Sequence, residues 1–110
     1  MRNLDLAWAA GFFDGEGTAY AKKNGAYSYL YLGLSQRDSR PMKRWVDIVQ
    51  CGKVYKKNST TSGKEFNDWM CWGDAVDILL NELWPYLSEP KKEQICQAHL
   101  KTGKGGSCGS

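Results

Sequence analysis

The chain has 110 residues, of which 42% are hydrophobic and 25% charged, and its formal net charge is +3. This length fits one domain rather than two, and a mildly basic charge permits nucleic-acid binding without requiring it. No apolar run reaches the roughly 20 residues that a membrane-spanning helix needs, and the N-terminal residues lack the small-residue cleavage site of a signal peptide. We therefore expect an intracellular, soluble protein with no membrane partner.

The chain begins with the pattern of a helix that is apolar nearly all round, followed by a hairpin. The helix is expected over 4–14, and Gly15 and Gly17 are expected to end it. Asn24-Gly25 is a strong hairpin dipeptide. The strands expected on its two sides are 18–23 and 27–36.

The second of these strands alternates between two kinds of side chain. Leucines occupy one face and tyrosines the other: Leu30, Leu32 and Leu34 against Tyr27, Tyr29 and Tyr31. This alternation predicts that the leucine face packs against other elements and that the tyrosine face meets a partner, since exposed aromatic patches usually mark binding sites.

The remaining residues predict two more strands and three more helices. The expected elements are a helix from 38–41 to Gly52, strands over 53–58 and 65–72, a helix over 74–83 and a last helix over 91–101. The order α-β-β-α-β-β-α(-α) predicts a single α+β domain over 1–101. Residues 102–110 are rich in Gly and Ser, which predicts a flexible tail.

The first helix carries a stripe of small residues and ends in two acids. Ala7, Ala10, Gly11 and Asp14 fall on one stripe, which would let another helix approach closely. Asp14 and Glu16 lie at the C-terminal end of this helix, where the helix dipole disfavours anions. A bound hard cation such as Mg²⁺ would account for them. A plain core helix with a glycine cap explains the packing but not the acids.

Residues 9–17, with the sequence AAGFFDGEG, resemble the LAGLIDADG motif of homing endonucleases position by position, in an aromatic variant. The order of elements also matches the family. The segment WPYL at 84–87, followed by Lys91 and Lys92, is similar to its C-terminal element. The resemblance implies the homing-endonuclease fold, with a curved antiparallel DNA-binding sheet and helices on the other face.

This resemblance also implies an activity. A single motif implies a homodimer that makes a double-strand cut in a palindromic or nearly palindromic DNA target, by hydrolysis that depends on Mg²⁺ or another divalent cation such as Mn²⁺. The chain would then serve intron or intein mobility in a bacterium, a phage-infected cell or an organelle. The residues expected at the dimer interface are Ala7, Ala10, Gly11 and Asp14.

The family resemblance further suggests the catalytic residues. Glu16 would bind the metal, with the Gly15 carbonyl as a further ligand, while Asp14 would brace the end of the helix. Gln36 matches a polar position that orients solvent. Lys91 matches the lysine of the active site, although the spacing from Pro85 is one residue longer than usual and leaves Lys92 as the alternative.

The tyrosine face of the second strand is expected to be the DNA face, continued by the first strand from Glu16 onward. The sequence does not decide which face of the last strand, 65–72, meets DNA, because its aromatic residues and Met70 occur at both parities. The expected DNA contacts are Thr18, Tyr20, Lys22, Asn24, Tyr27, Tyr29, Tyr31, Arg37, Arg40, Tyr55, Lys57, Asn67 and Trp69.

Three other functions compete with the nuclease. An RNA-binding maturase that helps an intron to splice, or a DNA-binding protein without cleavage activity, would use the same fold and would not need Glu16. The third is a structural α+β domain that carries the motif by chance. The presence of Glu16 favours the nuclease.

Overall fold

Nine elements follow one another in the computed structural model, which describes residues 2–103. They are α1 (Arg2–Glu16), β1 (Gly17–Asn24), β2 (Tyr27–Gln36), α2 (Ser39–Val49), β3 (Lys53–Asn58), β4 (Glu65–Trp72), α3 (Asp74–Leu83), the 3-10 turn η1 (Trp84–Tyr86) and α4 (Glu89–Leu100). The expected α+β class and the order of elements are confirmed. From residue 104 onward, the expected tail lies outside the described residues.

Several helix boundaries differ from the expectation, and α1 already begins at Arg2. Gly15 does not end α1, which continues to Glu16, and Gly17 is the first residue of β1. The last helix begins at Glu89 rather than Lys91, because the Ser88 hydroxyl accepts a hydrogen bond from the Lys91 amide and Pro90 is tolerated in the first helical turn.

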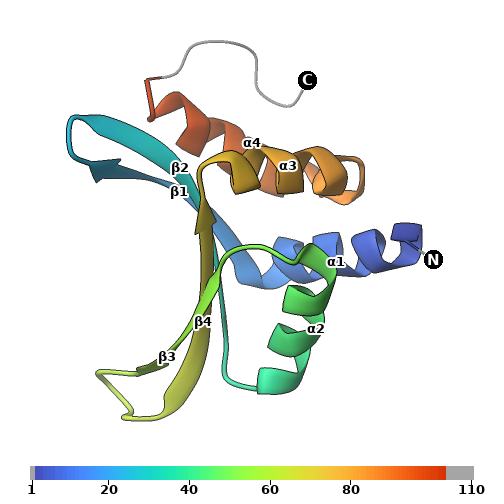
Figure 1. Ribbon diagram of the computed structural model, residues 1–110, viewed down its shortest axis with the longest axis vertical. Helices are drawn as coiled ribbons and strands as arrows, with labels where there is room; N and C mark the ends of the chain where they lie inside the picture. The colour runs from blue at the N-terminus through green and yellow to red at the C-terminus, as the bar shows by residue number, and fades with distance from the viewer. Residues whose placement is uncertain (1, 104–110) are drawn as a thin grey trace.

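The four strands form one antiparallel sheet in the order β1-β2-β4-β3. The helices lie on one side of this sheet, and the two hairpins extend beyond them (Figure 1). The sheet therefore has a helix face, which is covered, and an open face. No helix within residues 2–103 is long and apolar enough to cross a membrane.

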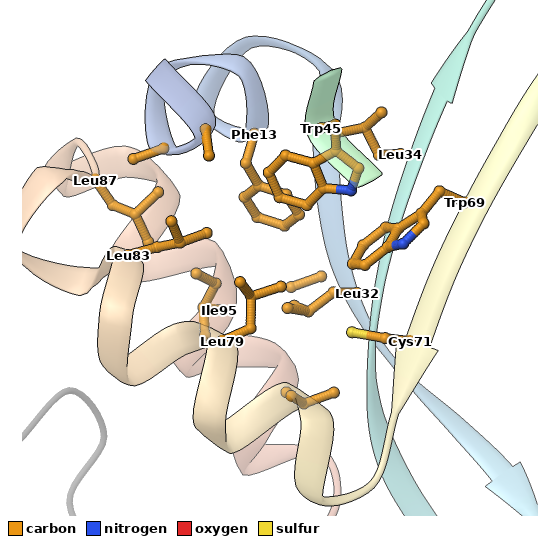
Figure 2. Close-up of a cluster of buried hydrophobic side chains, with 14 of the residues drawn as sticks. Phe13, Leu32, Leu34, Trp45, Trp69, Cys71, Leu79, Leu83, Leu87 and Ile95 are labelled. Carbon is orange, nitrogen blue, oxygen red and sulfur yellow. The ribbon is translucent and has the colours of Figure 1, made fainter. Parts of the chain in front are cut away.

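The core fills the space between the helices and the helix face of the sheet (Figure 2). Its centre is a run of aromatic rings, with Phe13 stacked on Trp45 at 5.9 Å and Trp45 edge-on to Trp69 at 5.0 Å between ring centroids. All three side chains are fully buried. Removing one such ring costs about 3–5 kcal/mol, so this run of rings makes a large contribution to holding α1 and α2 on the sheet.

Gly52 has a different role from the one that the sequence indicated. Helix α2 ends at Val49, and its C-cap residue Gln50 adopts the left-handed conformation with φ of 51°. Gly52 also has a positive φ, and a Cβ atom there would lie 2.5 Å from Trp69 Nε1 and 2.6 Å from the Met70 carbonyl oxygen. Glycine at 52 thus lets Trp69 donate a hydrogen bond of 2.8 Å to the Cys51 carbonyl.

Candidate active site and nucleic-acid interface

The register of the first hairpin decides which side chains lie on the open face. Leu32 and Leu34 belong to the core, so their neighbours in the strands point the other way. The cross-strand pairs on the open face are Thr18 with Gly33, Tyr20 with Tyr31, Lys22 with Tyr29, and Asn24 with Tyr27. The predicted facing of this hairpin is confirmed, because its tyrosines and polar residues share the face that the helices leave uncovered. Their contact with DNA stays a prediction.

Three aromatic side chains form a ladder across the open face. Tyr20, Tyr31 and Trp72 are direct partners in neighbouring strands. Their rings stack at 5.6 Å and 5.7 Å between centroids. The Lys22 ammonium lies over the Tyr31 ring at 5.6 Å, and that of Lys53 over the Trp72 ring at 5.8 Å. Burial, and next the charge of Asp68, raise the pKa of Tyr20, so its hydroxyl remains a hydrogen-bond donor at neutral pH.

A polar cluster next to this ladder joins three strands. The Asp68 carboxylate on β4 accepts a hydrogen bond of 2.8 Å from the Ser35 hydroxyl on β2 and forms an ion pair of 2.9 Å with Lys57 on β3. The hydrogen bond to Asp68, followed by its charge, raises the pKa of Lys57. Ser35, Asp68 and Trp72 were not among the predicted contacts. The tyrosine alternation of β2 could have indicated Ser35, but β4 carries no such pattern.

Two of the four DNA contacts predicted in the second hairpin are wrong. Tyr55 pairs with Asp68 and Lys57 with Phe66, so both lie on the open face as expected. Trp69 pairs with Leu34 and is 0% exposed, so it belongs to the core and cannot contact DNA. Asn67 has the same parity as Trp69, is buried, and donates a hydrogen bond to the Gln36 carbonyl.

Glu16 is the last residue of α1 and is exposed. Together with Thr18, Tyr20, Ser35 and Asp68 it lines a hollow in the open face. The end of the motif helix therefore opens onto the same surface as the aromatic ladder and the polar cluster. A carboxylate and backbone oxygens of this kind are the ligands that hard divalent cations prefer.

Gln36 does not line the hollow that Glu16 lines. Gln36 lies two residues beyond Leu34, so its side chain has the parity of the helix face, and Ser35 lines the hollow in its place. Arg37 is exposed beyond the end of β2. Arg40 lies at the start of α2, where its guanidinium and its amide donate hydrogen bonds to the Asp38 carboxylate. These bonds lower the pKa of Asp38 to about 2.

Lys91, rather than Lys92, lies against the end of the motif. The Lys91 ammonium donates hydrogen bonds to the Gly17 carbonyl at 2.7 Å and to Gln94 Oε1 at 3.0 Å. The Lys92 ammonium instead pairs with Glu89 at 3.5 Å and lies over the Trp84 ring. The extra residue before Lys91 is thus absorbed at the beginning of α4.

Asp14 braces a helix end, as expected, but the helix is α4. Its carboxylate oxygen Oδ1 accepts hydrogen bonds from the Ser88 amide at 3.0 Å and the Ser88 hydroxyl at 2.9 Å. Ser88 is the N-cap of α4. A negative charge is favourable at a helix N-terminus, so the position of Asp14 is electrostatically favourable after all.

The outer side of α1 differs in two residues from the predicted stripe, because Asp14 turns to Ser88 of its own chain and Ala10 is buried. Ala10 is 0% exposed and packs in the core of its own chain, so it cannot form a dimer contact. Ala7 and Gly11 are exposed, and Leu4 is 75% exposed. A Cβ atom added at Gly11 or Gly15 would meet nothing within 4 Å among the described residues. The exposed stripe of α1 is therefore Leu4, Ala7, Gly11 and Gly15.

Comparison with solved structures gives similar folds across nearly the whole chain. The homing endonuclease I-CvuI, in complex with its target in the presence of 2 mM Ca, matches with a TM-score of 0.65 and 25% identity, over 93% of this chain and 66% of that one. A second I-CvuI structure, with uncleaved I-CreI target and 2 mM Mg, matches with a TM-score of 0.67 at the same identity and coverage. The chain thus spans just under two thirds of the length of I-CvuI.

Two further structures show the same fold at lower identity. The archaeal intron-encoded homing endonuclease I-Vdi141I, complexed with DNA, has a TM-score of 0.68 and 9% identity over 94% of this chain and 70% of that one. The LAGLIDADG meganuclease I-AabMI, bound to uncleaved DNA, has a TM-score of 0.61 and 20% identity over 76% of this chain and 30% of that one. No protein-family model matches the chain, and no curated protein sequence matches it.

A four-stranded antiparallel sheet with helices on one face, and a motif helix whose terminal acid opens onto the other, defines the homing-endonuclease fold. The motif at 9–17 resembles that of the LAGLIDADG homing endonucleases, and the solved structures of these enzymes share the fold of this chain.

Proposed function

We propose that this chain is a sequence-specific DNA endonuclease that acts as a homodimer and cuts both strands of a palindromic or nearly palindromic target. One observation carries the proposal. Glu16 lies exposed at the end of the motif helix, lines the hollow of the open face, and belongs to the same helix as the exposed stripe of Leu4, Ala7, Gly11 and Gly15. Pairing of two such helices would bring two Glu16 carboxylates together above one DNA duplex.

The donor set of one chain fits half of a metal site. Glu16 and the Gly15 carbonyl offer hard oxygen ligands, but within residues 2–103 no three His, Cys, Asp or Glu side chains converge. The remaining ligands would have to come from a second copy and from DNA phosphates. When bound, a divalent ion such as Mg²⁺ or Mn²⁺ would activate water and stabilise the leaving oxygen.

The remaining chemistry belongs to the protein side chains. The Lys91 ammonium, held beside Gly17, would neutralise charge on the scissile phosphate as the phosphorane-like transition state forms. A water-orienting role for Gln36 stays a prediction, because its side chain has the parity of the helix face. Ser35 and Asp68 lie closer to the hollow that Glu16 lines.

The open face supplies the DNA contacts. Lys22, Lys53 and Lys57 lie along it and would attract phosphates, while the tyrosine hydroxyls of β1 and β2 can reach base edges or phosphates in the major groove. Arg40 would contribute less than the sequence suggested, because it is paired with Asp38.

The test is cleavage of selected DNA. Duplexes from a randomised library are first enriched by binding to the protein without divalent cations and are then exposed to Mg²⁺. We expect double-strand cuts from the native chain and none from Glu16→Gln. The control is Glu93→Gln, because Glu93 is two residues from Lys91 on α4 and therefore points away from it. Cuts by both native chain and Glu16→Gln would refute the assigned catalytic acid.

The competing function is intron RNA binding on the same open face. The aromatic ladder is the observation that favours it, because aromatic rings stack with unpaired bases. The two functions separate in one comparison. Tight binding to structured intron RNA, combined with no cleavage of any enriched duplex in Mg²⁺ or Mn²⁺, would replace the nuclease by a maturase.

A further inference from the structure

The ammonium of Lys91 is held at a defined point at the end of the motif. It donates to the Gly17 carbonyl at 2.7 Å and to Gln94 Oε1 at 3.0 Å, and it lies 5.5 Å from the centre of the Phe13 ring. An ammonium has three N–H donors. Two of them have acceptors among the described residues, which leaves the third N–H for a ligand at this end of the motif helix.

Gln94 holds this ammonium from the adjacent turn of α4. Its Oε1 accepts from Lys91, and its Nε2 lies 3.5 Å from Thr18 Oγ1, on the open face of β1. Gln94 is exposed, and an exposed glutamine ordinarily keeps its rotamer freedom. Here its two ends instead link the lysine to the strand that follows the motif.

Asp14 fixes the position of the backbone around Lys91. Its carboxylate binds the Ser88 amide and hydroxyl, and the Ser88 hydroxyl in turn accepts from the Lys91 amide at 3.4 Å. Because Ser88 is the N-cap of α4, Asp14 sets the position of the first turn of α4 relative to the motif helix. One motif residue thus controls the backbone of Lys91, while Gln94 controls its ammonium.

We propose that Asp14 and Gln94 are positioning residues that hold the Lys91 ammonium against the end of the motif, with one N–H directed to a DNA phosphate. The inference rests on the proposed nuclease function, in which Lys91 acts on the scissile phosphate. Displacement of a reacting group by about 1 Å can cost on the order of 100-fold in rate. A looser ammonium therefore slows the cut while DNA binding, which involves the whole open face, is retained.

The variants are chosen to separate positioning from folding. Gln94→Leu removes the acceptor, whereas Gln94→Glu keeps one. Asp14→Leu removes the brace of Ser88, whereas Asp14→Asn keeps an oxygen acceptor. The matched control is Gln97→Leu, because Gln97 is an exposed glutamine one turn further along α4.

Three measurements are made on the full-length protein. The ¹⁵N–¹H NMR signal of the Lys91 ammonium, assigned with Lys91→Met, reports its order without DNA or metal. DNA affinity without divalent cations and the single-turnover cleavage rate at saturating protein complete the set. We expect Gln94→Leu and Asp14→Leu to lose ammonium order and to cut at least 10-fold more slowly, with affinity changed less than 3-fold. Gln94→Glu, Asp14→Asn and Gln97→Leu should stay near the native chain.

The outcomes distinguish this inference from the proposed function. Unchanged ammonium order and unchanged cleavage in Gln94→Leu and Asp14→Leu would overturn the positioning role and leave the nuclease intact. Equal losses of DNA affinity and rate would also overturn it, because the residues would then shape the DNA surface. A native chain that cuts no duplex would refute the nuclease, while the NMR comparison would still decide whether Asp14 and Gln94 hold the ammonium.

Discussion

The Asp14 carboxylate binds both the amide and the hydroxyl of Ser88, a residue 74 positions later in the chain. This contact joins the end of α1 to the beginning of α4 and places a negative charge at the favourable end of a helix. It also separates the two acids of the motif. Asp14 is partly buried and turned to Ser88, while Glu16 is exposed at the hollow of the open face.

Asp14→Ala is expected to destabilise the fold by about 2 kcal/mol or more, since hydrogen bonds to a charged group contribute about 1.5–3 kcal/mol. Ser88→Ala removes only the hydroxyl and should cost about 1 kcal/mol. Guanidinium denaturation followed by circular dichroism measures both. If the two variants are as stable as the native chain, the link between α1 and α4 contributes nothing to folding.

Gly17→Ala is expected to cost about 1–3 kcal/mol through overpacking. A Cβ atom at this position would overlap the Phe13 ring, which is fully buried and stacked on Trp45. Phe13→Leu should therefore remove part of the penalty when combined with Gly17→Ala. A double-mutant cycle in denaturant measures this coupling, and strictly additive effects would argue against the overlap.

Gly11→Leu is expected to convert the proposed dimer into a monomer. Gly11 is exposed and has open space around it within its own chain, so the larger side chain leaves the fold intact but blocks close helix pairing. Light scattering gives the mass in solution. Asp5→Leu is the control, because Asp5 is exposed on α1 about 120° around the helix from Gly11. A dimer that persists in Gly11→Leu would exclude pairing through this stripe.

Trp69→Phe is expected to affect stability and not DNA binding. The indole is fully buried and donates to the Cys51 carbonyl, so its replacement leaves that oxygen without its partner and costs about 1–3 kcal/mol. Trp72→Phe provides the contrast, because Trp72 is 40% exposed on the open face. Denaturation measures the stability of both variants, and DNA titration measures their affinity for DNA. A large loss of affinity in a stably folded Trp69→Phe would contradict its assignment to the core.

Lys57→Met is expected to weaken DNA binding and to lower the salt dependence of the binding constant by at most about one phosphate contact per protomer, because Lys57 is also paired with Asp68. Its neighbour Lys56 is the control, because it pairs with Asn67 and has the parity of the helix face. Titration at several salt concentrations gives the slope for each variant. Equal slopes for Lys57→Met and Lys56→Met would mean that the open face of β3 does not contact phosphates.

The strands show where sequence reasoning succeeds and where it stops. The faces of β2 could be predicted because leucines and tyrosines alternate with the period of a strand. The faces of β4 could not, because Phe66, Trp69, Met70 and Trp72 place large apolar residues on both sides. Only the pairing of Trp69 with Leu34, and the close approach that Gly52 allows, puts Trp69 in the core.

The local sequence determined the order of the elements, the bounds of most of them, and the acid at the end of the motif helix, because periodicity, capping residues and hairpin dipeptides act over a few residues. The tertiary structure decided which side chains those elements expose. It buried Ala10 and Trp69, brought Lys91 rather than Lys92 to Gly17, and gave Asp14 a partner at the start of α4. These choices depend on how helices pack on the twisted sheet, and that packing brings together residues whose distance along the chain carries no local signal.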